Sequence, residues 1–345
     1  MYLSELTALS GVSGNEQAVR AYICERLHGH CEKIEIDSMG NVMAFKSGTK
    51  QTNRTLMLCA HMDEVGLIVS RITEEGFLKF KTVGGIDPRV LVSKRVYVGQ
   101  NALPGVIGRK AIHLLTAEER KKAPKVKDLL IDIGAADMAE AETLVSVGDY
   151  VTFDSDFVEF GEGRIKAKAL DDRVGCAVLL QLLEKECAVD RWFVFTVQEE
   201  TGLRGARLCA RRIKPDLAVV LEGTTCSDLP GTEDKMTSTR LGGGAAISLI
   251  DGATSYNRTL ARWLYDLGQQ KGIAVQFKKT ATGGNDAGSI HTAAGGILTA
   301  AISVPARYIH SPSGVIAKDD YSAVLQLTEA LLEEADYACT FTKTM

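Results

Sequence analysis

The alternation of apolar runs with amphipathic stretches after residue 167 constrains the fold more than any other feature of the sequence. Each apolar run has the length of one buried strand, and the stretches between the runs repeat apolar residues at helical spacing. This order is typical of a mostly parallel sheet that helices cover on both faces. The expected strands are 192–197, 217–221, 245–250, 274–277 and 297–304, and the expected helices are 172–186, 203–213, 255–271 and 321–337.

The first 65 residues have the same character, whereas residues 66–166 differ. The N-terminal part predicts a helix over 15–27 and strands over 31–36, 42–45 and 55–60. The middle part contains short alternating runs separated by Gly or Pro turns, which predict a small β-barrel or sandwich. Its expected strands are 67–72, 77–82, 95–98, 129–133 and 150–158, with one helix near 138–145. We therefore expect an α/β domain made of residues 1–65 and 167–345, with a β-rich domain inserted at 66–166.

Composition narrows the class of protein. The 345 residues are 45% hydrophobic and 24% charged, with a net charge of −4, which is typical of a globular protein with no general attraction for nucleic acid or anionic membranes. The longest uncharged stretch, 287–306, contains His, Pro and Gly and is a poor membrane span. The start has no secretory signal and the eight cysteines form no Cys-x-x-Cys pair, so we expect a cytoplasmic protein with reduced thiols. We interpret the basic stretch 120–127 as a solvated loop.

Polar residues follow the apolar runs at the points where the strands should end. Ligands of open α/β sheets bind beyond the carboxyl ends of the strands, so these residues are candidates for a site. They comprise two histidines and several carboxylates: His61 and Asp63 after 55–60, Glu199 and Glu200 after 192–197, Glu222 after 217–221, His310 after 297–304, and Asp171 and Asp172 at the start of a helix.

Several carboxylates gathered at one edge would repel one another, and a bound divalent cation relieves that repulsion. Mixed imidazole and carboxylate ligands suit Zn²⁺, Co²⁺ or Mn²⁺. Five ligands with one bridging carboxylate can hold two such ions roughly 3.5–4 Å apart, as in co-catalytic hydrolases. The sequence therefore predicts a site for two divalent cations.

Four stretches together resemble the tetrahedral aminopeptidases, metallopeptidase family forty-two, and the likeness runs over essentially the whole chain. They are 60–66 (Ala-His-Met-Asp-Glu-Val-Gly), 169–175 (Ala-Leu-Asp-Asp-Arg-Val-Gly), 197–205 (Val-Gln-Glu-Glu-Thr-Gly-Leu-Arg-Gly) and 307–312 (Arg-Tyr-Ile-His-Ser-Pro). The resemblance implies a two-metal catalytic domain with an inserted PDZ-like barrel. It also implies a homo-oligomer, usually a dodecamer, which the barrel helps to assemble.

The resemblance also implies a role for each matching position. Asp171 would bridge the two ions, and a cis peptide would follow it. The ligands His61 and Glu222 would complete one metal site, and Glu200 and His310 would complete the other. Glu199 would be the general base. Asp63 lies two residues after His61 on the same side of an extended chain, so it could accept the second ring N–H of that histidine.

Two positions depart from the family pattern. Glu222 stands where relatives usually carry Asp, and Asn285 stands where a Thr is expected. The neighbouring Asp286 and His291 are candidates for contact with the substrate. The remaining histidines, His28, His30 and His113, have no carboxylates near them in the sequence, and we interpret them as surface residues; the run 242–244 of three glycines lacks a phosphate-binding motif and is interpreted as a loop.

The expected function is removal of N-terminal residues from short peptides by a two-metal aminopeptidase. A deacylase or other amide hydrolase with the same two ions is the nearest alternative. Glycoside hydrolysis needs two facing carboxyl groups and no histidine ligands, so the residues favour it less. A non-enzymatic assembly protein should have lost a ligand or the base, and the sequence retains all of them.

Overall fold

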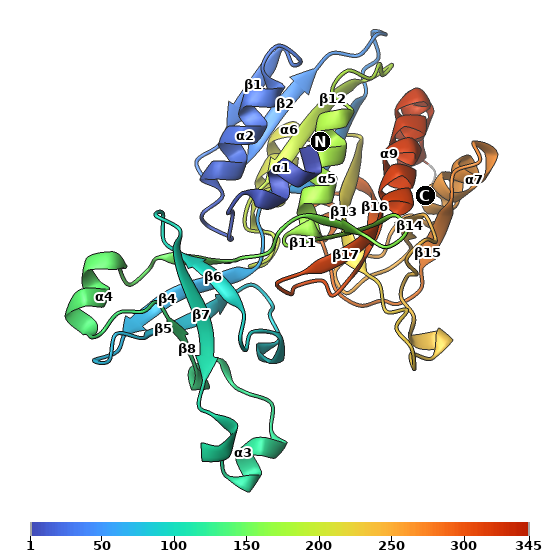
Figure 1. Cartoon of the computed structure of the whole chain (residues 1–345). Coiled ribbons are helices and arrows are strands. Elements are labelled where there is room, and N and C mark those ends of the chain that lie inside the picture. Colours follow the sequence, from blue (N-terminus) through green and yellow to red (C-terminus); the bar gives the residue numbers. More distant parts are fainter. Residues whose placement is uncertain (1, 344–345) are drawn as a thin grey trace.

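Eleven strands form one mixed sheet whose centre is parallel. The computed structural model describes residues 2–343 (Figure 1). Along the sheet the strands are β1 (Lys33–Ile36), β2 (Val42–Lys46), β12 (Asp190–Thr196), β3 (Thr55–His61), β13 (Leu217–Thr225), β16 (Leu298–Arg307), β17 (Gly314–Ala317), β11 (Arg164–Ala167) and β10 (Val158–Phe160). In addition, β14 (Ala245–Ser248) pairs with β16, and β15 (Val275–Lys278) pairs with β14. Strands β12, β3, β13 and β16 run parallel, so their carboxyl ends meet at one edge.

Alternate residues of β3 enter two separate cores, because successive side chains of a strand point to opposite faces. Leu56 and Leu58 belong to one core and Met57 and Cys59 to the other. The larger core is covered by α1 (Tyr2–Ala8), α2 (Gln17–Leu27), α5 (Leu170–Gln181), α7 (Arg258–Gln270), α9 (Lys318–Glu333) and α10 (Ala335–Ala338). The smaller core is covered by α6 (Arg204–Ile213) and α8 (Ala287–Ile290). The expected layers of helix, sheet and helix are therefore confirmed.

A closed six-stranded barrel is inserted in the chain between β3 and β10, and it lies at one side of the α/β layers (Figure 1). Its core is separate, with Leu67, Leu78 and Ile131 fully buried. The strands in order around the barrel are β4 (Gly66–Ile72), β5 (Leu78–Val83), β8 (Leu129–Asp132), β7 (Leu103–Arg109), β6 (Arg95–Val98) and β9 (Tyr150–Phe153), and its helices are α3 (Ala117–Lys121) and α4 (Met138–Leu144).

Several elements differ from the sequence-based expectations. The sequence did not suggest α1, β7, β10, β11 or β17. The strand expected over 150–158 ends at Phe153, and the helix expected to reach residue 337 breaks at Glu334. The basic stretch is exposed as expected, but α3 includes its first two residues and begins with a capping box between Thr116 and Glu119. Within residues 2–343, no helix combines the length and the apolar character that a bilayer crossing requires.

Candidate metal centre

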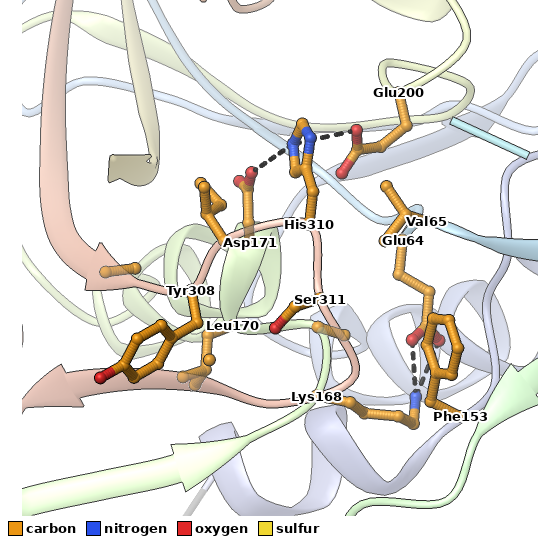
Figure 2. Close-up of a pocket in the computed structure, with 14 residues that line it drawn as sticks. Glu64, Val65, Phe153, Lys168, Leu170, Asp171, Glu200, Tyr308, His310 and Ser311 are labelled. Carbon is orange, nitrogen blue, oxygen red and sulfur yellow. Dashed lines mark hydrogen bonds and ion pairs between the residues drawn. The ribbon is translucent and has the colours of Figure 1, made fainter. Parts of the chain in front are cut away.

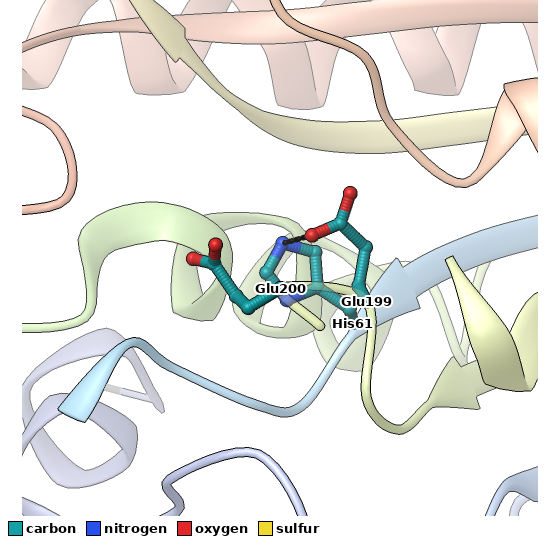
Figure 3. Close-up of side chains that lie close together, drawn as sticks. All are labelled: His61, Glu199 and Glu200. Atoms are coloured by element: carbon teal, nitrogen blue, oxygen red, sulfur yellow. Dashed lines mark ion pairs between the residues drawn. The ribbon is translucent and has the colours of Figure 1, made fainter. Parts of the chain in front are cut away.

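The carboxyl edge of the parallel strands brings most of the predicted site residues together. His61 is the last residue of β3, the pair Glu199 and Glu200 follows β12, and His310 follows β16. Asp171 comes from the kinked start of α5. Two groups have ligand atoms within 4.8 Å of one another: His61 with Glu199 and Glu200 (Figure 3), and Asp171 with Glu200 and His310 (Figure 2).

Asp171 lies between the two histidines. Its Oδ1 is 3.3 Å from His61 Nε2, and its Oδ2 is 3.5 Å from His310 Nε2. On the other side, Glu200 Oε2 is 3.3 Å from the same His310 nitrogen (Figure 2). The peptide between Asp171 and Asp172 is cis, as the family resemblance implies. One carboxylate thus faces both halves of the cluster, which is the arrangement that a bridging ligand requires.

Asp63 organises the buried half of the cluster through the backbone. Its carboxylate accepts the N–H groups of Glu199 (3.0 Å) and Glu200 (3.1 Å) and the hydroxyl of Ser13 (2.5 Å). The Nδ1 of His61 is 3.0 Å from the carbonyl oxygen of Asp63 and 3.5 Å from its carboxylate. The carbonyl therefore holds the second ring nitrogen of His61, and the carboxylate holds the turn that carries the two glutamates.

Burial makes the carboxylates of this edge costly to ionise without a cation. It raises the pKa of Glu200 and of Glu222 to about 8, and it raises the pKa of Glu199 well above its usual range. Burial also opposes ionisation of Asp171 and of His310. For Asp171, the attraction of His310 and His61 together outweighs burial and lowers its pKa, and for His310 the attraction of Asp171 and Glu200 together outweighs burial and raises its pKa to about 9. Additional positive charge would make the ionisation of Glu199, Glu200 and Glu222 less costly.

The residues present fit a divalent cation. Asp171 Oδ1 and Glu200 Oε1 are buried and accept no hydrogen bond from the residues that the structure describes. A buried carboxylate oxygen without a donor is costly unless a cation coordinates it. The neighbouring donors are imidazole nitrogens and carboxylate oxygens, which are the ligands that Zn²⁺, Co²⁺ and Mn²⁺ accept.

A small pocket opens beside His310 and Glu200 (Figure 2). Val65 and Phe153, at the two ends of the barrel segment, form part of its wall, so the pocket lies between the α/β layers and the barrel. Non-glycine residues with positive φ concentrate in the segments that build the cluster: Ala169, Gln198, Leu203, Tyr308 and His310. Such backbone strain is characteristic of functional sites, where the surrounding structure enforces it.

A buried ion-pair network that the sequence did not suggest ties the N-terminus to the cluster. Glu64 pairs with Lys168 (2.8 Å) and Arg173 (3.2 Å), and it also accepts the N–H of Gly11. Lys168 donates to the carbonyl of Leu9 at 2.6 Å. A lysine inside the apolar run 167–170 was the available signal, because an unpaired lysine is rarely buried.

Besides Asp63, three further candidate residues lie outside the two close groups. Glu222 is buried in β13, the strand between β3 and β16, and it belongs to neither close group. Asp286 is 1% exposed, and its carboxylate accepts the hydroxyl of Thr196 at 2.6 Å. His291 is half-buried and its Nδ1 lies 2.8 Å from the carbonyl oxygen of Ala287 in the preceding turn. Neither Asp286 nor His291 lines the pocket beside His310.

Comparison with known proteins agrees with this architecture. Residues 40–327 match the family described as M42 glutamyl aminopeptidase. The chain belongs to the M42 peptidase family. It is 31% identical to a glutamyl aminopeptidase of Lactococcus lactis over 337 residues, covering 95% of this chain and 94% of that protein.

Solved structures of this family have the same fold. An aminopeptidase from Desulfurococcus kamchatkensis superposes with a TM-score of 0.94 at 36% identity, covering 99% of this chain and 97% of that chain. A Pyrococcus horikoshii TET1 peptidase, described as assembling into a tetrahedron or a large octahedral shell, gives a TM-score of 0.85 at 33% identity. The match covers 96% of this chain and 98% of that chain. This M42 chain is therefore a metallo-aminopeptidase with the family's fold.

Proposed function

We propose that this M42 chain removes N-terminal residues from short peptides with two divalent cations held at the carboxyl edge of the sheet. Asp171 is the bridging ligand, with His61 and Glu222 completing one site and Glu200 and His310 the other. The position of Asp171 between the two histidines is the observation that supports this proposal most strongly. When bound, the ions supply Lewis acidity and lower the pKa of a coordinated water.

Glu199 is the general base in this proposal. Its Oε2 lies 3.9 Å from His61 Nε2 (Figure 3), and its backbone N–H is fixed by Asp63. A carboxylate beside the reacting water takes its proton and returns that proton to the departing amine.

The pocket beside His310 receives the substrate. Tyr308, which is 51% exposed, lies at the pocket, and the barrel residue Phe153 forms part of the wall. A free α-amine at the end of a peptide is a neutral ligand for a cation once it loses its proton, which explains a requirement for an unblocked N-terminus.

We also propose that the chain forms a homo-oligomer, with the inserted 66–166 segment contributing to assembly. The TET1 peptidase shells support this oligomeric state, and the separate core of the barrel makes the segment a self-contained unit. A dodecamer and a cytoplasmic location stay predictions from the sequence. Light scattering of the purified chain measures the oligomer directly.

The proposed chemistry is tested with Glu199→Gln, which removes the base and keeps a similar shape. We expect turnover of free peptides to fall by about 10²–10⁴-fold while two ions per chain remain, because Glu199 is not a ligand. The surface substitution Glu186→Gln is the matched control and should change neither quantity. An active variant with both ions would refute the role of the base.

The substrate class is tested with a peptide pool, half with free and half with acetylated N-termini. Chelator-stripped protein with Co²⁺ or Zn²⁺ restored should shorten only the free peptides, one residue at a time. Processing of the acetylated half alone would instead indicate a deacylase, and no change in either half would favour an assembly protein.

A further inference from the structure

The two positions that depart from the family pattern are in direct contact. Asn285 Nδ2 lies 2.8 Å from Glu222 Oε1, although 63 residues separate them in the chain. The same oxygen accepts the hydroxyl of Ser303 at 3.1 Å. Ser303 lies opposite Glu222 in the parallel pair of β13 and β16. All three side chains are at most 5% exposed, so water does not compete for these bonds.

The orientation of the Asn285 amide is fixed by its other partners. The backbone N–H of Ala287 donates to Asn285 Oδ1 at 2.8 Å, and a backbone N–H can only donate. The amide oxygen is thereby assigned, so the NH₂ group must face Glu222. Its second hydrogen points to the hydroxyl of Tyr256 (3.0 Å), which itself donates to Asp251 (2.7 Å).

This chain of donors determines which oxygen of Glu222 is available. Two donors occupy Oε1, and no residue in the described range 2–343 donates to Oε2. A glutamate also has one more side-chain torsion than an aspartate, and that torsion must be fixed before the carboxylate can bind a cation in one geometry. Asn285 and Ser303 fix it.

We propose that Asn285 is the positioning residue for Glu222: it holds Oε1 and leaves Oε2 as the single oxygen presented to a divalent cation. The inference rests on the proposed metal centre and adds a residue to it. Glu222 and Asn285 then act as a matched pair, in which the longer carboxylate is useful only because the amide restrains it. Outer partners of this kind typically change metal affinity by 10- to 100-fold.

The test is a Co²⁺ titration of the stripped full-length chain, followed by visible absorption and by competition with a chromophoric chelator. We expect Asn285→Ala to weaken one of the two ions by about 10- to 100-fold and to leave the other unchanged. In a Glu222→Asp background the shorter carboxylate is out of reach of the amide, so Asn285→Ala should cost less than about 3-fold. A merely structural role would instead lower the affinity equally in both backgrounds.

Two further variants keep the test decisive. Asn257→Ala removes another asparagine, the cap that accepts the N–H of Leu260 in α7, and should leave both affinities unchanged. If Asn285→Ala does not fold, Ser303→Ala removes the second donor and should weaken the same ion several-fold. Unchanged affinities in Ser303→Ala, or in a folded Asn285→Ala, would overturn the inference. A native chain that binds fewer than two ions would instead refute the proposed function.

Discussion

The two histidines of the candidate metal centre occupy contrasting surroundings. The side chain of His61 is 4% exposed, and that of His310 is 39% exposed. His61 ends a central strand, and its backbone N–H donates to Asp172 at 3.0 Å. His310 lies in a loop with a positive φ of 55° and borders the pocket. One half of the centre is therefore fixed by the sheet, and the other is the side from which a substrate can approach.

The largest expected effect on activity comes from removing each histidine in turn, which tests this contrast. We expect both His61→Ala and His310→Ala to lower activity by roughly 10³-fold or more, since loss of a ligand exceeds the 10- to 100-fold cost of losing an outer partner. Added imidazole should restore activity to His310→Ala only, because only that vacancy opens to the pocket. Equal rescue of both variants, measured as turnover against imidazole concentration, would contradict the difference in access.

Without a bound cation, the buried carboxylates in the two halves of the metal centre should cost similar free energy to ionise. Burial raises the pKa of Glu222, in the fixed half, and of Glu200, in the open half, from 4.5 to about 8. Between these values the folded metal-free protein holds more protons than the unfolded chain, so its stability falls as pH rises from about 4.5 to 8 and is level above. Glu222→Gln and Glu200→Gln should each make this loss of stability smaller. The expected difference in the free energy of unfolding is roughly 2–4 kcal/mol at pH 8.

Thermal unfolding of the metal-free protein across this pH window measures the slope. Glu186→Gln, which is exposed, serves as the control and should leave it intact. A metal-free protein that grows more stable from pH 5 to pH 8 would show that the buried carboxylates are compensated without a cation.

The smallest expected effect is on stability, and it comes from removing the hydroxyl of one serine in each half of the metal centre. Ser13→Ala removes the hydroxyl that donates to the buried carboxylate of Asp63, which should cost about 1.5–3 kcal/mol. Ser311→Ala removes a bond of 3.1 Å to the carbonyl of Ser313 and should cost about 0.5–1.5 kcal/mol. Urea unfolding of both variants gives the two values, and equal losses would weaken the distinction between a fixed and an open half.

Strands with a strong sequence pattern were predictable, and so were the residues at their ends. The apolar runs of β3, β12, β13 and β16 identify the centre of the sheet, and the polar residues after them identify the site. Strand β7 was missed because it contains Pro104, Gly105 and Gly108, which are unusual inside a strand. Strand β17 has only four residues and begins two residues after Pro312, so it lacks a periodic pattern.

Contacts between distant segments were not predictable from one sequence. Asn285 was recognised only as an unexpected residue, because nothing local shows that its amide reaches Glu222. Similarly, the pairing of Lys168, just before α5, with Glu64, just after β3, depends on how α5 packs against β3. Local pattern therefore identified the predicted ligands, whereas the hydrogen bonds that orient them depend on the assembled fold.

The dispersal of the proposed ligands along the chain has a consequence for protein synthesis. His310 follows His61 by 249 residues. On the proposed ligand set, a partly translated chain that has not yet reached His310 lacks a ligand of the second ion. The chemistry therefore waits for the translation of β16 and the loop after it, and a product truncated before His310 carries no complete metal centre.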